Sequence, residues 1–268
     1  MEPVIVSELL TYLLTGAVAG LMAGLLGIGG GLVIVPALAW LFAGQGFTEA
    51  TLMHYAVGTS LATIVLTSVS SLLAHHRRGS VLWPAVRNMA PGIVIGALAG
   101  AWLAKQLSSP GLALFFGMFE ILVALQLLVG HQPAAHRSLP GPAALTAAGS
   151  VIGAVSAVFG IGGGTLSVPF LLWNRVDIRA AVGTAATCGL PIALAGAAGF
   201  VITGLGAAGQ PDWSSGFVYW PAVAGIVLTS VLLAPLGARL AHYLPRQILQ
   251  RMFAVLLVLV GLKMISGA

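Results

Sequence analysis

The chain has 268 residues, a formal net charge of +5 and a strongly apolar composition. Hydrophobic residues make up 59% of it and charged residues only 6%, whereas about a quarter of the residues in a soluble domain are charged. This composition excludes a soluble enzyme or binding domain and predicts an integral protein of the lipid bilayer. The eleven basic residues are scattered among loops and form no patch, so we expect no nucleic-acid partner.

Apolar runs long enough to cross a bilayer recur along the chain. Crossing a hydrocarbon core of about 30 Å takes about 20 helical residues. We therefore predict spanning helices at 4–26, 51–74, 81–104, 111–130, 141–159, 180–205, 217–238 and 252–266. Two more apolar pieces, 32–43 and 165–173, are too short to cross alone, because the longer of them rises only about 18 Å as a helix.

A glycine motif stands immediately before each short piece. GIGGG occupies Gly27–Gly31 and Gly160–Gly164, and each copy is followed by Val-Pro and then by a tryptophan. Further landmarks repeat in the same order, namely AVGT at Ala56–Thr59 and Ala181–Thr184, and WPAV at Trp83–Val86 and Trp220–Val223. The repetition indicates an internal duplication.

We interpret each half as a helix that enters the membrane, a glycine break, a half-helix that returns to the same side, and three spans. The first half, 1–133, has its hairpin at 4–43 and spans at 51–74, 81–104 and 111–130. The second half, 134–268, has its hairpin at 141–173 and spans at 180–205, 217–238 and 252–266. Since three spans carry the chain across, the halves should face opposite ways. The predicted fold class is an all-α polytopic membrane protein of two inverted repeats, each a broken-helix hairpin plus three transmembrane helices.

The loop charges indicate an orientation independently. If the loop His75–Ser80 is cytoplasmic, alternation of the spans places nine basic residues on that side: Arg77, Arg78, Arg87, Arg137, Arg175, Arg179, Arg239, Arg246 and Arg251. Only Lys105 and Lys263 fall on the other side. Since cytoplasmic loops carry an excess of Lys and Arg, we predict a multi-pass protein of the cytoplasmic (inner) membrane with both termini on the non-cytoplasmic side.

A glycine break inside a membrane predicts a binding site. Unwound backbone at membrane depth is tolerated only where it is buried in protein or lines a watery cavity. A half-helix that starts there directs its free N–H groups and positive dipole end toward the membrane centre, where they attract an anion. The candidate substrate-binding residues at the two breaks are Gly29, Gly30, Gly31, Gly162, Gly163, Gly164 and Thr165.

Glycines in such a run can also serve two different purposes. Small residues let membrane helices pack closely, and a lone glycine pair would favour that interpretation. A dinucleotide-binding loop needs a soluble strand–turn–helix unit, and neither flank of either motif supplies one. The duplicated motif, with its shared downstream landmarks, favours the break.

Hydroxyl residues in the AVGT spans are further candidates for substrate binding. Thr59 and Thr184 recur in both halves, and Ser60 follows the first of them. Fixed hydroxyls donate hydrogen bonds to an anion without adding a permanent charge that would hold it too tightly. The alternative is ordinary bonding between helices or to the preceding turn.

Three ionisable residues are candidates for moving protons or attracting anions. Glu120 lies near the centre of its span, where a carboxylate costs at least about 2.5 kcal/mol, so it is either a proton carrier or an acid bonded to a neighbouring helix. His54 precedes AVGT and either titrates near neutral pH or serves at the membrane interface. Arg87 either attracts anions at an entrance or extends to the cytoplasmic surface.

GIGGG followed by Val-Pro in both halves, with AVGT in the next span, resembles the TauE/SafE sulfite exporter family, also called the toluene sulfonate uptake permease family. The resemblance covers essentially the whole chain. It implies proton-coupled transport of sulfur-containing anions such as sulfite, thiosulfate or organosulfonates like sulfoacetate, in either direction, and it does not select the anion.

We therefore predict a secondary transporter, not an enzyme, that exports a small sulfur-containing anion by alternating access. The partners are that anion, protons and the bilayer, and no cofactor or metal is expected because HExxH, GxSxG and Cys/His clusters are absent from the sequence. A passive anion channel stays open as an alternative, as does a membrane-embedded enzyme. The sequence requires no oligomer and is compatible with a homodimer.

Overall fold

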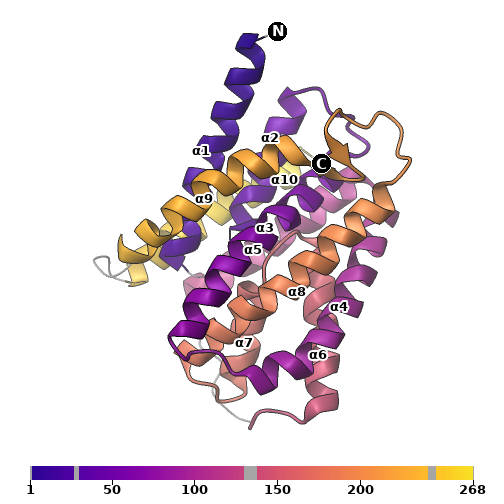
Figure 1. The fold of residues 1–268 in the computed structure, drawn as a ribbon. Helices are drawn as coiled ribbons and strands as arrows, with labels where there is room; N and C mark the ends of the chain where they lie inside the picture. Colours follow the sequence, from indigo (N-terminus) through magenta and orange to yellow (C-terminus); the bar gives the residue numbers. More distant parts are fainter. Residues whose placement is uncertain (1, 27–29, 130–137, 241–245, 268) are drawn as a thin grey trace.

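The computed structural model describes residues 2–26, 30–129, 138–240 and 246–267. These residues form ten helices and one small antiparallel β-hairpin (Figure 1). The first half of the chain contributes α1 (Glu2–Leu26), α2 (Gly31–Gly44), α3 (Leu52–Arg77), α4 (Trp83–Gln106) and α5 (Ser109–Val129). The second half contributes α6 (Pro142–Val158), α7 (Gly164–Trp173), α8 (Ile178–Gly204), β1 (Ser214–Ser215), β2 (Val218–Tyr219), α9 (Trp220–Leu240) and α10 (Arg246–Ser266).

The all-α polytopic fold expected from the composition is confirmed. Within the described ranges, five helices are long and apolar enough to cross a membrane: α3, α4, α5, α8 and the segment Ile248–Ser266 of α10. Shorter apolar helical segments lie in α1, α2, α6, α7 and α9. The two apolar pieces that are too short to cross a membrane alone, 32–43 and 165–173, form the separate helices α2 and α7.

Two expected helix starts are wrong. Helix α10 begins at Arg246, before the expected start at 252. The apolar run at 217–238 predicts a helix throughout, but α9 begins only at Trp220. Val218 and Tyr219 are instead extended and pair with Ser215 and Ser214. The preceding Gly216 has φ +54, which favours glycine and allows the chain to turn back on itself. Hydropathy alone does not distinguish such a hairpin from the first turn of a helix.

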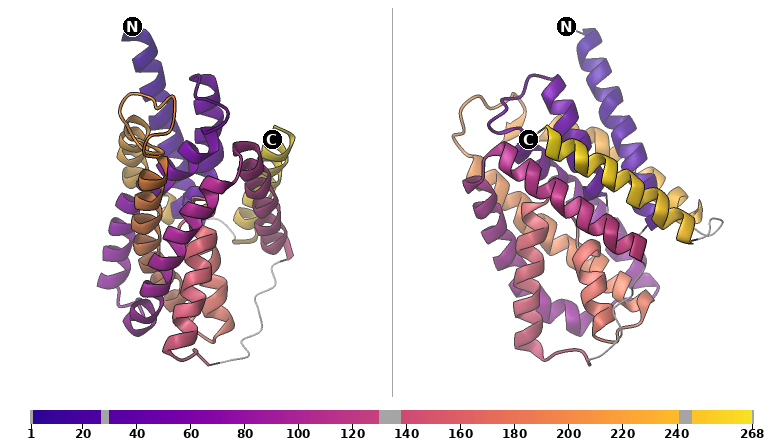
Figure 2. Two further views of the ribbon diagram at one scale, coloured as in Figure 1. Left: turned by 90° about the vertical axis from the view of Figure 1, so that its right-hand side faces the viewer. Right: turned by 180° about the vertical axis from the view of Figure 1, so that it is seen from behind.

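Helices α3 and α8 pack against each other through the centre of the protein, and α2 and α7 each pack on one of them. Around this centre α4 lies against α6 and α1 against α9, while α5 and α10 lie side by side (Figure 2). The N-terminal end of α1 and the C-terminal end of α2 lie toward the upper end of the view in Figure 1, whereas α7 ends at the lower end. The two short helices thus lead away from the middle toward opposite ends.

The contact between α4 and α6 is built on glycine. A methyl group added to Gly96 of α4 would overlap the backbone oxygen of Ser150 in α6, and one added to Gly153 of α6 would overlap that of Ile93. Backbones that approach this closely gain dispersion contacts that larger residues would prevent, which is the usual basis of helix association in lipid.

The contact between α1 and α9 repeats this arrangement. A methyl group on Gly16 of α1 would overlap the backbone oxygen of Ile226 in α9. In the same way, one on Gly149 of α6 would overlap the backbone oxygen of Met89 in α4. Gly149 and Gly16 occupy the same place relative to the two GIGGG motifs, and Met89 and Ile226 the same place relative to the two WPAV motifs. The same pair of positions therefore meets twice, each time between one half of the chain and the other.

We expect Gly96→Val to lower the free energy of unfolding by about 1–3 kcal/mol, because the added side chain must push α6 away. The measurement is the melting temperature of the purified protein in detergent, followed by intrinsic fluorescence. Ala99→Val is the matched control, since Ala99 lies on the exposed face of the same helix. Equal melting temperatures for the two variants would contradict the close contact.

Candidate functional site

The second glycine motif ends one helix and starts another inside the protein. After α6, Gly160 adopts φ +63, a conformation that side chains other than glycine rarely tolerate. Its N–H donates to the carbonyl oxygen of Ala157 at 3.3 Å, and the N–H of Ile161 donates to that of Ser156 at 3.0 Å. These two bonds form a Schellman cap, which satisfies the last carbonyls of α6 and turns the chain sharply.

Helix α7 begins three residues later. Gly163 is its N-cap, and the N–H of Ser167 donates to the carbonyl oxygen of Gly163 at 3.0 Å. A methyl group on Gly163 would overlap the backbone oxygen of Ala185 in α8. Gly160 to Gly163 are all buried, so the break lies in protein and not in lipid.

The first glycine motif meets the second. Gly30 is the N-cap of α2, and a methyl group on Gly31 would lie 2.5 Å from the carbonyl oxygen of Gly160 and 2.8 Å from Cα of Ile161. The predicted residue Gly29 lies outside the described residues. Positions that are far apart in the sequence therefore come into direct contact at the breaks.

Ser60 joins this contact from α3. Its hydroxyl donates to the carbonyl oxygen of Gly160 at 2.8 Å, and both residues are fully or almost fully buried. The structure thus brings together three of the predicted binding elements, which are the start of α2, the second glycine motif and the AVGT span. The bond fixes the turn at Gly160, and a binding role of Ser60 stays a prediction.

Thr59 and Thr184 hold the ends of two other helices. Thr59 Oγ1 accepts a hydrogen bond from the backbone N–H of Tyr219 at 3.0 Å, just before α9. Thr184 Oγ1 accepts one from the backbone N–H of Leu82 at 2.9 Å, just before α4. The two bonds are counterparts in the two halves, and each crosses from one half to the other. They give these threonines a structural role, while donation to an anion stays a prediction.

The remaining residues of the second motif lie close by. Gly162 is buried, and a methyl group on it would lie 3.7 Å from Ile64 Cγ2. Gly164 is half-buried at the first position of α7, and the side chain of Thr165 after it is buried.

Glu120 is fully buried and follows Phe119, whose ring stacks on that of Phe159, the residue directly before the second glycine motif. It lies on α5 against α10, where a methyl group on Gly261 would lie 3.4 Å from its Cβ. Neither carboxyl oxygen has a hydrogen-bond partner among the described residues. Of the two roles that its sequence position suggests, the bond to a neighbouring helix is not formed here.

His54 and Arg87 are placed differently from each other. His54 is buried near the start of α3, with Nε2 3.0 Å from the carbonyl oxygen of Ala104 and its ring 5.1 Å from that of Phe217. It precedes Ser60 by about 9 Å along the helix axis. Arg87 is exposed near the start of α4. Neither residue is in contact with the breaks, and their suggested roles stay predictions.

Two serines beside the second motif are not among the residues that the sequence predicts for the site. Ser156 and Ser167 are fully buried, and within the part of the chain that the structure describes their hydroxyls have no partner. A single serine in an apolar run carries no motif. The available signal is the difference between the two copies, since Ala23 and Ile34 stand at the matching places beside the first motif.

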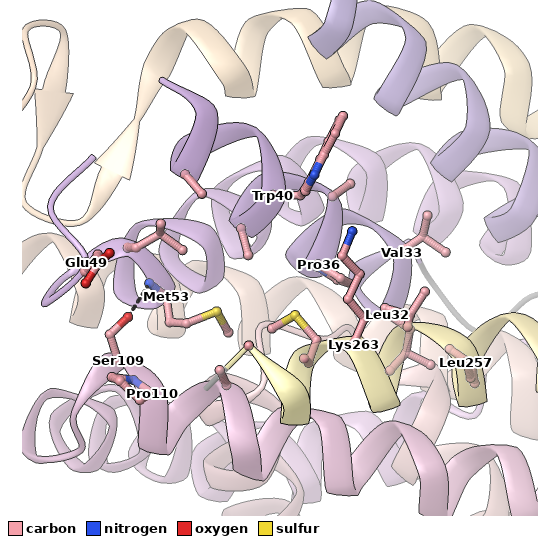
Figure 3. A pocket seen from close by; sticks show the side chains of 18 of the residues that line it. Leu32, Val33, Pro36, Trp40, Glu49, Met53, Ser109, Pro110, Leu257 and Lys263 are labelled. Carbon is pink, nitrogen blue, oxygen red and sulfur yellow. Dashed lines mark hydrogen bonds between the residues drawn. The ribbon is translucent and has the colours of Figure 1, made fainter. Parts of the chain in front are cut away.

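A cavity of about 690 Å³ lies between α2 on one side and the adjacent helices α5 and α10 on the other (Figure 3). Its inner part is lined by Leu32, directly after the first glycine motif, and by Leu257. Most of the lining is apolar, and the charged side chains are Lys263 and Glu49. Lys263 extends toward α2, where Nζ lies 5.8 Å from the ring centroid of Trp40. The walls suit hydrocarbon better than a small hydrated anion.

The described ranges contain no group of three His, Cys, Asp or Glu side chains arranged to hold a metal ion. The chemistry available at the breaks is instead hydrogen-bond donation by backbone N–H groups and hydroxyls.

Comparisons with known proteins agree on the kind of protein. The family described as Sulfite exporter TauE/SafE matches residues 12–264. A probable membrane transporter protein of Haemophilus influenzae is 38% identical over 96% of this chain and 97% of its own length. Probable membrane transporter protein YunE of Bacillus subtilis is 27% identical, over 93% of this chain and 94% of its own. Probable inner membrane transporter protein TsaS of Comamonas testosteroni is 30% identical, over 75% and 80%. No solved structure matches the chain.

We expect Thr184→Val to lower the free energy of unfolding by about 1–3 kcal/mol, because the backbone N–H of Leu82 loses its acceptor. Thr184→Ser keeps the hydroxyl and should melt close to the wild type. Melting temperatures in detergent measure both. A Thr184→Val protein with wild-type melting temperature would contradict the anchoring role.

Proposed function

Because the chain belongs to the TauE/SafE sulfite exporter family, we propose that it is a secondary transporter for a small sulfur-containing anion. The anion class is sulfite, thiosulfate or an organosulfonate such as sulfoacetate. We further propose that transport is export, that it is coupled to protons, and that it proceeds by alternating access across the cytoplasmic membrane. The names of the curated relatives are those of transporters, and the name of the Comamonas relative supports the inner membrane.

The observation that carries the proposal is the meeting of the two glycine motifs. Gly31 lies against Gly160 and Ile161, and a half-helix starts beside each motif. Each start presents N–H groups that have no acceptor within their own helix. Helix N-termini attract negative charge without a lysine or arginine, so an anion bound by them can leave again. A transporter needs a site that binds its substrate strongly enough to capture it and weakly enough to release it on the other side.

The two halves provide a means of alternating access if they are inverted repeats, as we propose. The contacts of Gly149 with Met89 and of Gly16 with Ile226 are counterparts. The bonds of Thr59 and Thr184 to the starts of α9 and α4 are counterparts as well. These pairs support a twofold relation between the halves. In transporters of inverted repeats, rocking of one part against the other exposes a fixed central site to each side in turn.

Glu120 is the proposed proton carrier. An ionised carboxylate in this apolar contact between α5 and α10 is costly without a partner, so proton uptake and release there must accompany a change of surroundings. Movement of α10 against α5 would supply that change. The counterpart of Glu120 in the second half is Ala254, so the proposed role belongs to one half alone.

The test is uptake of radiolabelled sulfite, thiosulfate and sulfoacetate into proteoliposomes, with and without an imposed pH gradient. We expect saturable flux of at least one anion that follows the gradient, and loss of this dependence in Glu120→Gln. Glu49→Gln is the matched control, because Glu49 is exposed. Flux that ignores the gradient in the wild type would contradict coupling and indicate a passive channel.

A further inference from the structure

Helix α2 packs closely on one side and borders a cavity on the other. It lies against α3 and α1, whereas it has few contacts with α10. The cavity between α2 and the pair α5 and α10 measures about 690 Å³, within the range of about 300–1,000 Å³ that is typical of ligand pockets. Among the five candidate spans of the described ranges, α10 is the least buried. Lipids of the bilayer are therefore the molecules nearest to this cavity.

The walls of the cavity are apolar along most of their length. Val33 and Ala37 line them from α2, and Leu256 and Val260 line them from α10. Apolar walls offer few hydrogen-bond partners, so water or a small ion is poorly held there. A flexible acyl chain instead fills such a space and makes dispersion contacts with both helices.

Lys263 is the one cation among the described residues that line the cavity. Its side chain extends from α10 toward α2, where Nζ lies 5.8 Å from the ring centroid of Trp40, within the range of a cation–π contact. No described residue forms an ion pair with it. Glu49, the acid of the lining, lies at a distance from Lys263 along the cavity (Figure 3). The positive charge is therefore available to an anionic group in the cavity.

Trp40 indicates the depth of Lys263 in the membrane. Its side chain is 66% exposed and borders the cavity from α2. Tryptophan is enriched where the hydrocarbon of a bilayer meets the headgroups, and a lysine in the last turn of a spanning helix, as Lys263 is, extends toward the same level. The two side chains together place this part of the cavity near the phosphate groups of the lipids.

The charge of Lys263 is not required by the fold. Counted from the repeated Met-Phe pairs, Met118–Phe119 and Met252–Phe253, Val129 of α5 stands at the place of Lys263. Helix α5 thus forms with an apolar residue where α10 has a cation. A ligand at Lys263 accounts for the difference between the two halves.

The inner end of the cavity reaches the first glycine motif. Leu32 lines the cavity and directly follows Gly31, which lies against Gly160. Leu32, Leu257 and Ile161 are buried in one cluster. An occupant of the cavity therefore touches residues that pack against the second glycine motif.

We propose that the cavity binds one anionic phospholipid, whose phosphate pairs with Lys263 and whose acyl chain lies along α2 against Leu32 and Leu257. The lipid completes the packing between α2 and α10 and supports the meeting of the two glycine motifs. This site is separate from the one proposed for the transported anion and does not depend on which anion that is.

The test measures lipid binding to the purified full-length protein by native mass spectrometry from detergent, with phosphatidylglycerol and phosphatidylcholine of the same acyl chains as probes. We expect the wild type to bind phosphatidylglycerol about fivefold more tightly, which is the effect of one basic residue near a membrane surface. Lys263→Gln should abolish this preference. Lys105→Gln is the matched control and should retain it, because Lys105 is also exposed in the last turn of a helix.

A second variant tests the cavity itself. Ala37 lines it from α2, and in Ala37→Phe a ring occupies the space of the acyl chain. We expect this variant to lose binding of both lipids. The melting temperature of each variant without added lipid shows that it is folded.

Equal affinity of the wild type for the two lipids would overturn the proposal, as would an unchanged preference for phosphatidylglycerol in Lys263→Gln. Wild-type lipid binding by Ala37→Phe would show that the chain lies elsewhere and would overturn it too. A protein dimer that dissociates in Ala37→Phe would mean that a second copy of the chain, and not a lipid, occupies this face.

Discussion

A helix that stops inside a membrane leaves backbone N–H and C=O groups where no water is available to bind them. Each unsatisfied group costs several kcal/mol in hydrocarbon, so the break must be enclosed by protein or open to a watery cavity. The arrangement at the second motif follows from this constraint. Gly160 and its Schellman bonds satisfy the end of α6, Ser60 covers the carbonyl of Gly160, and the backbone of α8 lies against Gly163.

At the start of α7, the backbone N–H groups of Gly164 and Leu166 have no acceptor among the described residues. Carbonyl groups at the end of α6 accept hydrogen bonds from the backbone N–H groups that follow them. The start of α7, on the other side of the break, has N–H donors and no side-chain cap. Under the proposed function, these donors bind the anion without a contribution from lysine or arginine. Pro169 adds an irregularity one turn further on, because it has no N–H to donate to the carbonyl of Thr165.

Close packing of glycine makes such an enclosure possible. Helices α4 and α6 touch through Gly96 and Gly153, and α1 and α9 touch through Gly16. Contacts between bare backbones depend on shape and bury little side-chain bulk. The most extensive helix pairs, α4 with α6 and α1 with α9, each join one half of the chain to the other.

Much of the fold was predictable from the sequence, since apolar length locates a membrane helix and GIGGG before a short apolar piece locates a break. The helices α2 and α7 appear where that pattern predicts them. The hairpin at Val218 and Tyr219 was not predictable, because hydropathy does not report whether backbone groups pair within a helix or between strands.

The site was predictable only in part. Gly31, Gly160 and Ser60 come together from regions that carry recognisable motifs. Ser156 and Ser167 carry none, and their lack of partners is seen only once the helices around the second motif are placed. Side-chain partners are the missing information, and they depend on tertiary packing.

The most direct test of alternating access is counterflow of radiolabelled anion into proteoliposomes preloaded with an excess of the same unlabelled anion, at equal pH on both sides. Alternating access predicts that label accumulates transiently inside above its outside concentration, because outward-moving unlabelled anion returns the carrier to capture label. Entry of label that rises only to equilibrium, with no overshoot, would contradict it.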